Sequence, residues 1–119
     1  MSIQLNLRFQ KNDRYGHPIF ICSCKNIDEN VGFNKLTNMS KKIDALNLKT
    51  FLPIYKTSDY ATIRFSHKKS DFVIGNTYTV DFTVKKNSYN SKMYINCYVD
   101  KCELFKEGVP YDEGEIMTF

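Results

Sequence analysis

Alternating apolar and polar residues predict strands at residues 3–9, 60–66, 77–85 and 93–104. The prediction follows because successive side chains of a strand point to opposite faces, so that a half-buried strand has a period of two. Residues 19–24 are apolar throughout and predict a strand in the middle of a sheet. The pattern therefore gives about five substantial strands.

The last two strands are predicted to form a long β-hairpin around the polar segment 87–92. The apolar positions of the second strand change parity between Val99 and Cys102. We therefore expect a β-bulge near Asp100 or Lys101, which would bend the strand as a small barrel requires.

Helical signals are weaker. Residues 40–50 predict a short helix, capped by Ser40 or Asn38 and ended by Pro53. Residues 25–39 are rich in Asn and show no period, so a loop or a short strand is expected there.

Five strands, one short helix and no repeated βα unit predict a mainly β protein, a small antiparallel barrel similar to the OB-fold. That fold usually places its helix between the third and fourth strands, whereas the helix expected here precedes the strand at residues 60–66. Either a strand is hidden in residues 25–39 or the architecture is a variant, and a β-sandwich is the alternative.

Charge is distributed unevenly along the 119 residues, which suffice for one domain. The net charge is +4, and because the last nine residues contribute −3, the first 110 carry +7. A basic domain of residues 1–110 with a short acidic tail of residues 111–119 favours a polyanionic partner. No stretch resembles a signal peptide or is long enough to span a membrane, so a cytoplasmic protein is expected, in the host cytoplasm if viral.

The polar face of the predicted hairpin is unusual because it carries tyrosines. Tyr94 and Tyr98 project from the same side of one strand, with Lys85, Lys86 and Lys92 nearby. Aromatic rings rimmed by lysines suit unpaired bases and their phosphates. Tyrosine also forms strands well, so exposed tyrosines without a ligand are an equal alternative.

The strand at residues 60–66 repeats the mixture, with Tyr60 and Arg64 on its polar side. The loop at residues 11–18 places Lys11, Arg14 and Tyr15 together, at a tip that could close over a nucleic-acid strand, and a solvated surface loop is an equal alternative. The predicted nucleic-acid-binding residues are Tyr60, Arg64, Lys68, Lys69, Lys85, Lys86, Tyr89, Lys92, Tyr94 and Tyr98.

The four cysteines are spaced C-x-C at Cys22 and Cys24 and C-x4-C at Cys97 and Cys102. Neither spacing is a common zinc-ligand pair. Reduced, mostly buried thiols are expected, with a zinc site or a disulfide framework as the alternatives. No metal and no cofactor is predicted.

Catalysis is not expected, because motifs of phosphate-binding loops, serine hydrolases and zinc proteases are missing from the sequence. His17 and His67 are interpreted as loop residues. Asp81 and Asp100 could meet across the hairpin as a metal-binding carboxylate pair, but neighbouring lysines are the simpler partners for them.

The last residues, YDEGEIMTF, resemble the tails of bacterial and phage single-stranded DNA-binding proteins. The acidic part of such tails is matched by Asp112, Glu113 and Glu115, and the apolar end by Ile116, Met117 and Phe119. In that family the acidic residues can compete with DNA, and the terminal aromatic docks on replication and repair proteins. The whole chain is similar to a small phage-type protein of this class, such as those of lactococcal phages.

The resemblance and the hairpin together predict sequence-independent binding of single-stranded DNA in replication or recombination. The resemblance also implies a homo-oligomer, with a dimer favoured, and partner proteins held through the tail. The alternatives are a structural or protein-interaction module of a phage, an RNA-binding OB domain and a nuclease.

Overall fold

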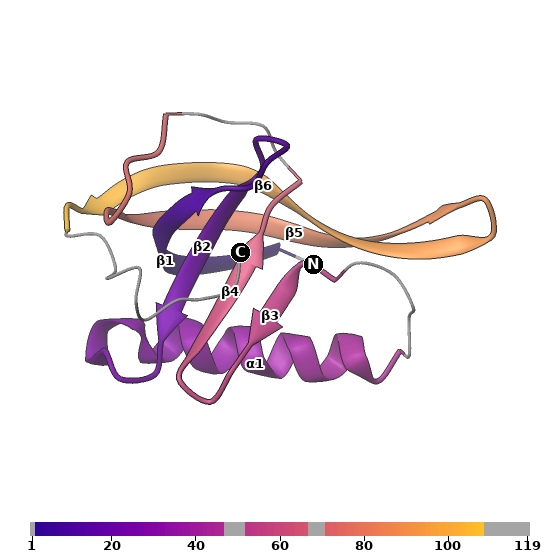
Figure 1. Ribbon diagram of the computed structural model, residues 1–119, viewed down its shortest axis with the longest axis horizontal. Helices are drawn as coiled ribbons and strands as arrows, with labels where there is room; N and C mark the ends of the chain where they lie inside the picture. The colour runs from indigo at the N-terminus through magenta and orange to yellow at the C-terminus, as the bar shows by residue number, and fades with distance from the viewer. Residues whose placement is uncertain (1, 47–51, 67–70, 109–119) are drawn as a thin grey trace.

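The computed structural model describes residues 2–46, 52–66 and 71–108 (Figure 1). Its strands are β1 (Ser2–Asn12), β2 (Pro18–Ser23), β3 (Ile54–Lys56), β4 (Tyr60–Arg64), β5 (Thr77–Tyr89) and β6 (Lys92–Lys106). A 3-10 helix, η1 (Ile27–Glu29), leads directly into the α-helix α1 (Asn30–Asp44), between β2 and β3. Within these ranges the protein is mainly β with one α-helix, as predicted.

All strands belong to one antiparallel sheet in the order β3-β4-β2-β1-β5-β6. The five predicted strands correspond to β1, β2, β4, β5 and β6, while β3 was not predicted. The sheet is strongly curved, and α1 runs along one side of it (Figure 1). The described residues contain no helix long and apolar enough to cross a membrane.

The concave face of the sheet holds the hydrophobic core. Phe20 lies at its centre, with its ring centroid 5.1–5.5 Å from those of Phe9, Phe65 and Phe72. Register places the apolar residues of neighbouring strands on this same side, for example Leu5 opposite Val80. Each such buried side chain contributes about 1.5–3 kcal/mol of hydrophobic free energy, and this burial curls the sheet around its apolar residues.

The β5–β6 hairpin is longer than the rest of the sheet and extends beyond it (Figure 1). Asp81 pairs with Lys101 and Phe82 with Val99, so Asp100 is the extra residue of a bulge. The predicted bulge is thereby confirmed. Strand pairing continues through most of the polar segment 87–92, around which the hairpin was predicted to form.

The helix does not lie where the sequence predicts it. Residues 25–39 were expected to be loop or strand and 40–50 helix, but α1 covers Asn30–Asp44, and residues 47–50 lie outside the described residues. The buried stripe of α1 consists of Gly32, Leu36, Ser40 and Ile43. Because two of these four residues are small and not apolar, their helical spacing is invisible in a hydrophobic pattern.

A buried ion pair fixes the start of α1 to the sheet. The Arg8 guanidinium lies 2.8 Å from the Glu29 carboxylate, which also accepts hydrogen bonds from the Ser23 backbone N–H and the Asn26 side chain. Glu29 is only 5% exposed, so these donors replace the water that its charge would otherwise require. The network holds η1 and the first turn of α1 against β1 and β2.

The barrel is only partly closed. The order β4-β2-β1-β5-β6 is compatible with an OB-like fold, in which five strands form a partly open barrel. No ladder joins β4 to β6 in the described residues. Instead, the Ser66 N–H, just after β4, donates to the Cys97 carbonyl of β6 at 2.9 Å. The helix lies between β2 and β4 and so precedes the third of these five strands in sequence, which makes the architecture a variant.

Candidate nucleic-acid interface

The outer face of the β5–β6 hairpin carries the predicted tyrosines. Residues paired across an antiparallel ladder point to the same side, so the register Thr83–Tyr98, Lys85–Asn96, Asn87–Tyr94 and Tyr89–Lys92 defines one face. We call these eight residues the hairpin face. It lies opposite the core side, where Val84 pairs with Cys97.

Tyr98 is held in place by two polar neighbours. The Lys85 ammonium lies 5.7 Å from the centroid of the Tyr98 ring, within the range of a cation–π interaction. The Asn87 side chain donates a hydrogen bond of 3.1 Å to the Tyr98 hydroxyl. Tyr98 is half-buried, so part of its ring is open to solvent in a fixed orientation.

Tyr94 and Tyr89 extend the hairpin face toward the turn. Tyr94 is half-buried and lies four positions before Tyr98, about 14 Å along the strand at about 3.4 Å per residue. At this distance the two rings are too far apart to stack on the same planar group. Tyr89 is 69% exposed and pairs with Lys92, so a ring and a cation stand together at the tip.

Lys86 lies on the opposite side of the hairpin from the tyrosines. It pairs with Ile95, a buried residue, and lines a depression with Ile43 of α1. Lys85 and Lys92 therefore border the predicted rings, whereas Lys86 does not. Lys68 and Lys69, also predicted to bind phosphates, lie outside the described residues.

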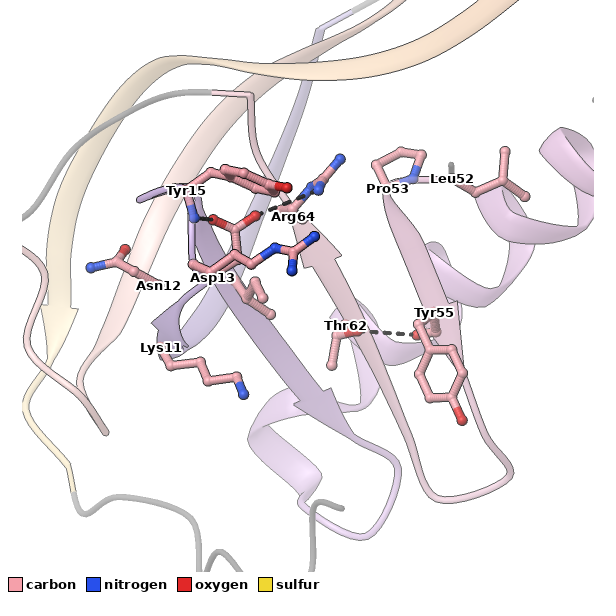
Figure 2. A pocket seen from close by; sticks show the side chains of 11 residues that line it. Lys11, Asn12, Asp13, Tyr15, Leu52, Pro53, Tyr55, Thr62 and Arg64 are labelled. Atoms are coloured by element: carbon pink, nitrogen blue, oxygen red, sulfur yellow. Dashed lines mark hydrogen bonds and ion pairs between the residues drawn. The ribbon is translucent and has the colours of Figure 1, made fainter. Parts of the chain in front are cut away.

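A second concave surface lies on the outer side of β2, β3 and β4 (Figure 2). We call it the loop groove. It has a volume of about 620 Å³ and is lined by residues 11–15, by residues 52, 53 and 55, and by Ile19, Thr62 and Arg64. Figure 2 shows Tyr15 on one side of the groove and Tyr55 on the other, with Arg64 and Thr62 between them.

The loop between β1 and β2 is organised by Asp13. Its carboxylate accepts hydrogen bonds from the backbone N–H groups of Tyr15 and His17, at 2.8 and 2.9 Å. Gly16 completes the turn with a φ of 84°, a left-handed conformation that glycine adopts without strain. Arg14 lies over the Tyr15 ring, 4.8 Å from its centroid. The predicted grouping of Arg14 and Tyr15 at this tip is thus observed.

Asp13 also reaches Arg64 on β4. The nearest carboxylate oxygen lies 3.5 Å from the Arg64 guanidinium and 3.5 Å from Nδ1 of His17. Burial alone would raise the pKa of Asp13. The hydrogen bonds from His17 and Tyr15, with the charges of His17 and Arg64, outweigh it and hold the pKa of Asp13 below its usual value.

Tyr60 and Arg64 share the outer face of β4, as predicted. Tyr55 of β3 joins them, because it pairs with Thr62 and its ring centroid lies 6.4 Å from that of Tyr60. The sequence analysis missed Tyr55, because a strand of three residues is too short to show a period. Tyr55 lies beside Tyr60 because β3 pairs with β4, and no pattern in the sequence shows that pairing.

The hairpin face and the loop groove adjoin each other at Ser66. The Ser66 hydroxyl donates to the Asn96 side-chain oxygen at 3.1 Å, and Asn96 lies between Tyr94 and Tyr98 on the hairpin face. Ser66 follows Arg64 by two residues, and Arg64 lines the loop groove. One outer surface therefore leads from the loop groove across the end of β4 to the hairpin tyrosines.

The cysteines are free thiols, two of them buried. Burial raises the pKa of the Cys22 thiol, where nearby Glu29 adds to the effect, and raises the pKa of Cys97 to about 12. Both stay protonated at neutral pH and behave as small apolar side chains. Among the described residues, no group of three or more His, Cys, Asp or Glu side chains could hold a metal ion.

The two carboxylates suggested as a pair have different neighbours. Asp100 accepts a hydrogen bond of 2.6 Å from the Thr83 hydroxyl, and Asp81 lies in the ladder opposite Lys101, whose ammonium is 3.1 Å from the Glu103 carboxylate. The predicted partner-binding tail, Asp112, Glu113, Glu115 and Phe119, lies outside the described residues, as does His67.

Comparison with known proteins finds no similarity to any protein-family model, curated protein or solved structure.

Proposed function

We propose that the protein binds single-stranded DNA without sequence preference, as a non-enzymatic component of replication or recombination. The observation that carries the proposal is the hairpin face, where Tyr94 and Tyr98 alternate with Asn96 beside Lys85. Rings that accept any base and cations that follow the backbone give affinity without sequence selection.

Tyr94, Tyr98 and Tyr89 stack on separate bases in this proposal, while Lys85 and Lys92 contact phosphates. The loop groove extends the path through Tyr15, Tyr55 and Arg64. Three of its lining residues are cationic and one, Asp13, is acidic, so the groove also favours an anion. Each stacked base contributes about 1–3 kcal/mol.

Tyrosine fluorescence is the natural measurement, because the chain has eight tyrosines and no tryptophan. Oligo(dT) added at low salt should quench the emission, and added salt should restore it as counterions compete for the DNA. The absence of quenching at low salt would exclude the proposal.

Two adjacent lysines give a matched pair of variants. Lys85→Gln should weaken binding and reduce the slope of log K against log salt by about 0.7, the value for one phosphate contact on a single strand. Lys86→Gln removes the same charge from the opposite face and should leave both quantities near wild type. Equal effects of the two substitutions would show that general charge, and not the hairpin face, drives binding.

An RNA competitor, size-exclusion chromatography and a cleavage assay test the alternatives. A protein that prefers RNA should respond to the 2′-hydroxyl and bind a matched RNA oligomer more tightly. A protein-interaction module should ignore all oligonucleotides in size-exclusion chromatography. Labelled DNA that stays intact with Mg²⁺ or Mn²⁺ would agree with a non-enzymatic role, and its cleavage would contradict it.

A further inference from the structure

A furrow follows the seam between α1 and the sheet. It consists of four neighbouring depressions, each sharing lining residues with the next. Asn6 and Asp28 are common to the first two, Gln4 joins the second to the third, and Ile3 and Met39 join the third to the fourth. A continuous path thus leads from the first turn of α1 to its last.

The far end of the furrow is apolar. Here a depression of about 410 Å³ is lined by Ile3, Met39, Ile43, Leu46, Val84 and Ile95. Of these residues Leu46 is 40% exposed, Ile3, Met39 and Val84 are partly buried, and Ile43 and Ile95 are buried. Apolar side chains placed over the exposed part would remove it from water, which is favourable.

The rim of this end is positively charged. Lys42 and Lys86 border the apolar depression, and Lys35 borders the one before it. All three lysines are exposed, and no carboxylate is among the described residues that line these two depressions. The chemistry fits a segment with acidic residues followed by apolar ones.

The described chain ends at the other end of the furrow. Gly108 lines the first depression, and its N–H donates a hydrogen bond of 3.2 Å to the Asn76 side chain. Lys106 lies 3.9 Å from Asp28 at the start of the helical region. Figure 1 shows the end of β6 and the first turn of α1 on the same side of the molecule.

The remaining residues have the required length. At about 1.5 Å per residue, the distance from Asp28 to Ile43 along the helical axis is about 22 Å. Residues 109–119 can span about 36–40 Å when extended. Counted from Gly108 at about 3.3 Å per residue, Asp112 to Glu115 fall alongside Lys35 and Lys42, and residues 116–119 reach the apolar depression.

We infer that residues 111–119 of the chain dock into this furrow in the same molecule. Asp112, Glu113 and Glu115 face the lysines, and Ile116, Met117 and Phe119 fill the apolar end. The apolar end of the furrow, lined by Val84 and Ile95, lies on the opposite side of the hairpin from Tyr94 and Tyr98, so a segment that fills this end leaves the hairpin face open. The inference goes beyond the proposed function and does not depend on it.

Carbodiimide cross-linking of the full chain tests the inference directly, because it joins a carboxylate to an amine only where they touch. The expected products join Asp112, Glu113 or Glu115 to Lys35, Lys42 or Lys86, within one molecule and at a yield independent of protein concentration. Lys86→Gln should abolish the products at that position, whereas Lys85→Gln should leave the pattern unchanged.

Three results would overturn the inference. They are cross-links to Lys85 or Lys92 on the hairpin face, cross-linked dimers whose yield rises with concentration, and no cross-link from these carboxylates. Methyl NMR of the full chain gives an independent measurement. Replacing Phe119 and Met117 with Ser should shift the methyl signals of Ile43 and Ile95 and leave that of Ile21, on the other face of the sheet, in place.

Discussion

One carboxylate, that of Asp13, connects the β1–β2 loop to the sheet. It accepts hydrogen bonds from the backbone N–H groups of Tyr15 and His17 and lies 3.5 Å from the Arg64 guanidinium. The same contacts hold its pKa below the usual value, because they stabilise the ionised form. Asp13 thus orders the loop groove while it neutralises part of the charge of that groove.

Replacing Asp13 should make stability less dependent on pH. Since the pKa of Asp13 is lower in the folded than in the unfolded protein, its contribution is present above the unfolded value and is lost as the pH falls through the folded one. Asp13→Asn should lower the free energy of unfolding at pH 7 by about 1 kcal/mol, the scale of one hydrogen bond.

Urea unfolding at pH 7 and below pH 3 measures this difference, which should nearly vanish in acid. Asp71→Asn, at an exposed position, is the control and should change little at either pH. If Asp13→Asn lowered the free energy of unfolding by the same amount in strong acid as at pH 7, the electrostatic explanation would be contradicted.

Lys85 and Lys86 show where the prediction of binding residues was wrong, because the two-residue period of a strand was not applied to them. Phe82 and Val84 are even-numbered core residues, so Lys86 belongs to their face and Lys85 to that of the tyrosines. Grouping the two lysines by proximity in sequence hid this difference. Strict application of the two-residue period would have separated them.

At the scale of elements, α1 depends on small residues. A Cβ atom at Gly32 would lie 2.5 Å from the Cys22 sulfur and 3.4 Å from the Asn6 carbonyl oxygen. Helix and sheet therefore approach closely at this point. A pattern search for apolar residues finds neither Gly32 nor Ser40, which explains why the helix was predicted ten residues too late.

Gly32→Ala should destabilise the protein although alanine favours helices. The new methyl group collides with a fully buried side chain, and such overpacking costs about 1–3 kcal/mol. In a Cys22→Ala background the collision is gone, so Gly32→Ala should there be neutral or stabilising by up to about 1 kcal/mol. Urea unfolding of the four proteins gives the coupling energy, and strictly additive effects would refute the contact.

The hairpin turn gives a second prediction for an element. Asn90 and Ser91 have φ values of 51° and 64°, the left-handed pair of a type I′ turn, in which glycine is preferred at the second position. Ser91→Gly should stabilise the tip by about 0.5–1 kcal/mol, since a residue other than glycine is strained there. Hydrogen exchange at Tyr89 and Lys92 should slow accordingly. Ser88→Gly, within β5, should accelerate it, and faster exchange in Ser91→Gly would contradict the assigned turn.

At the scale of the whole molecule, the sequence predicts strands better than it predicts their neighbours. The alternation at β1, β4, β5 and β6 and the bulge at Asp100 are local features, and the structure confirms them. The loop groove instead brings together the β1–β2 loop, β3 and β4 through long-range pairing. No local sequence pattern shows that these three elements are neighbours, so Tyr55 and Asp13 could not be assigned to a common surface.

The central position of β1 has a consequence for biosynthesis. β1 pairs with β5 along most of its length, although β5 begins only at Thr77. At a ribosomal rate of about 5–20 residues per second, the earliest strand waits several seconds for its partner. Until then Leu5, Leu7 and Phe9 of the nascent chain have no finished core to enter. Assembly of the core must therefore follow translation of β5, and chaperones can shield the waiting strand in the meantime.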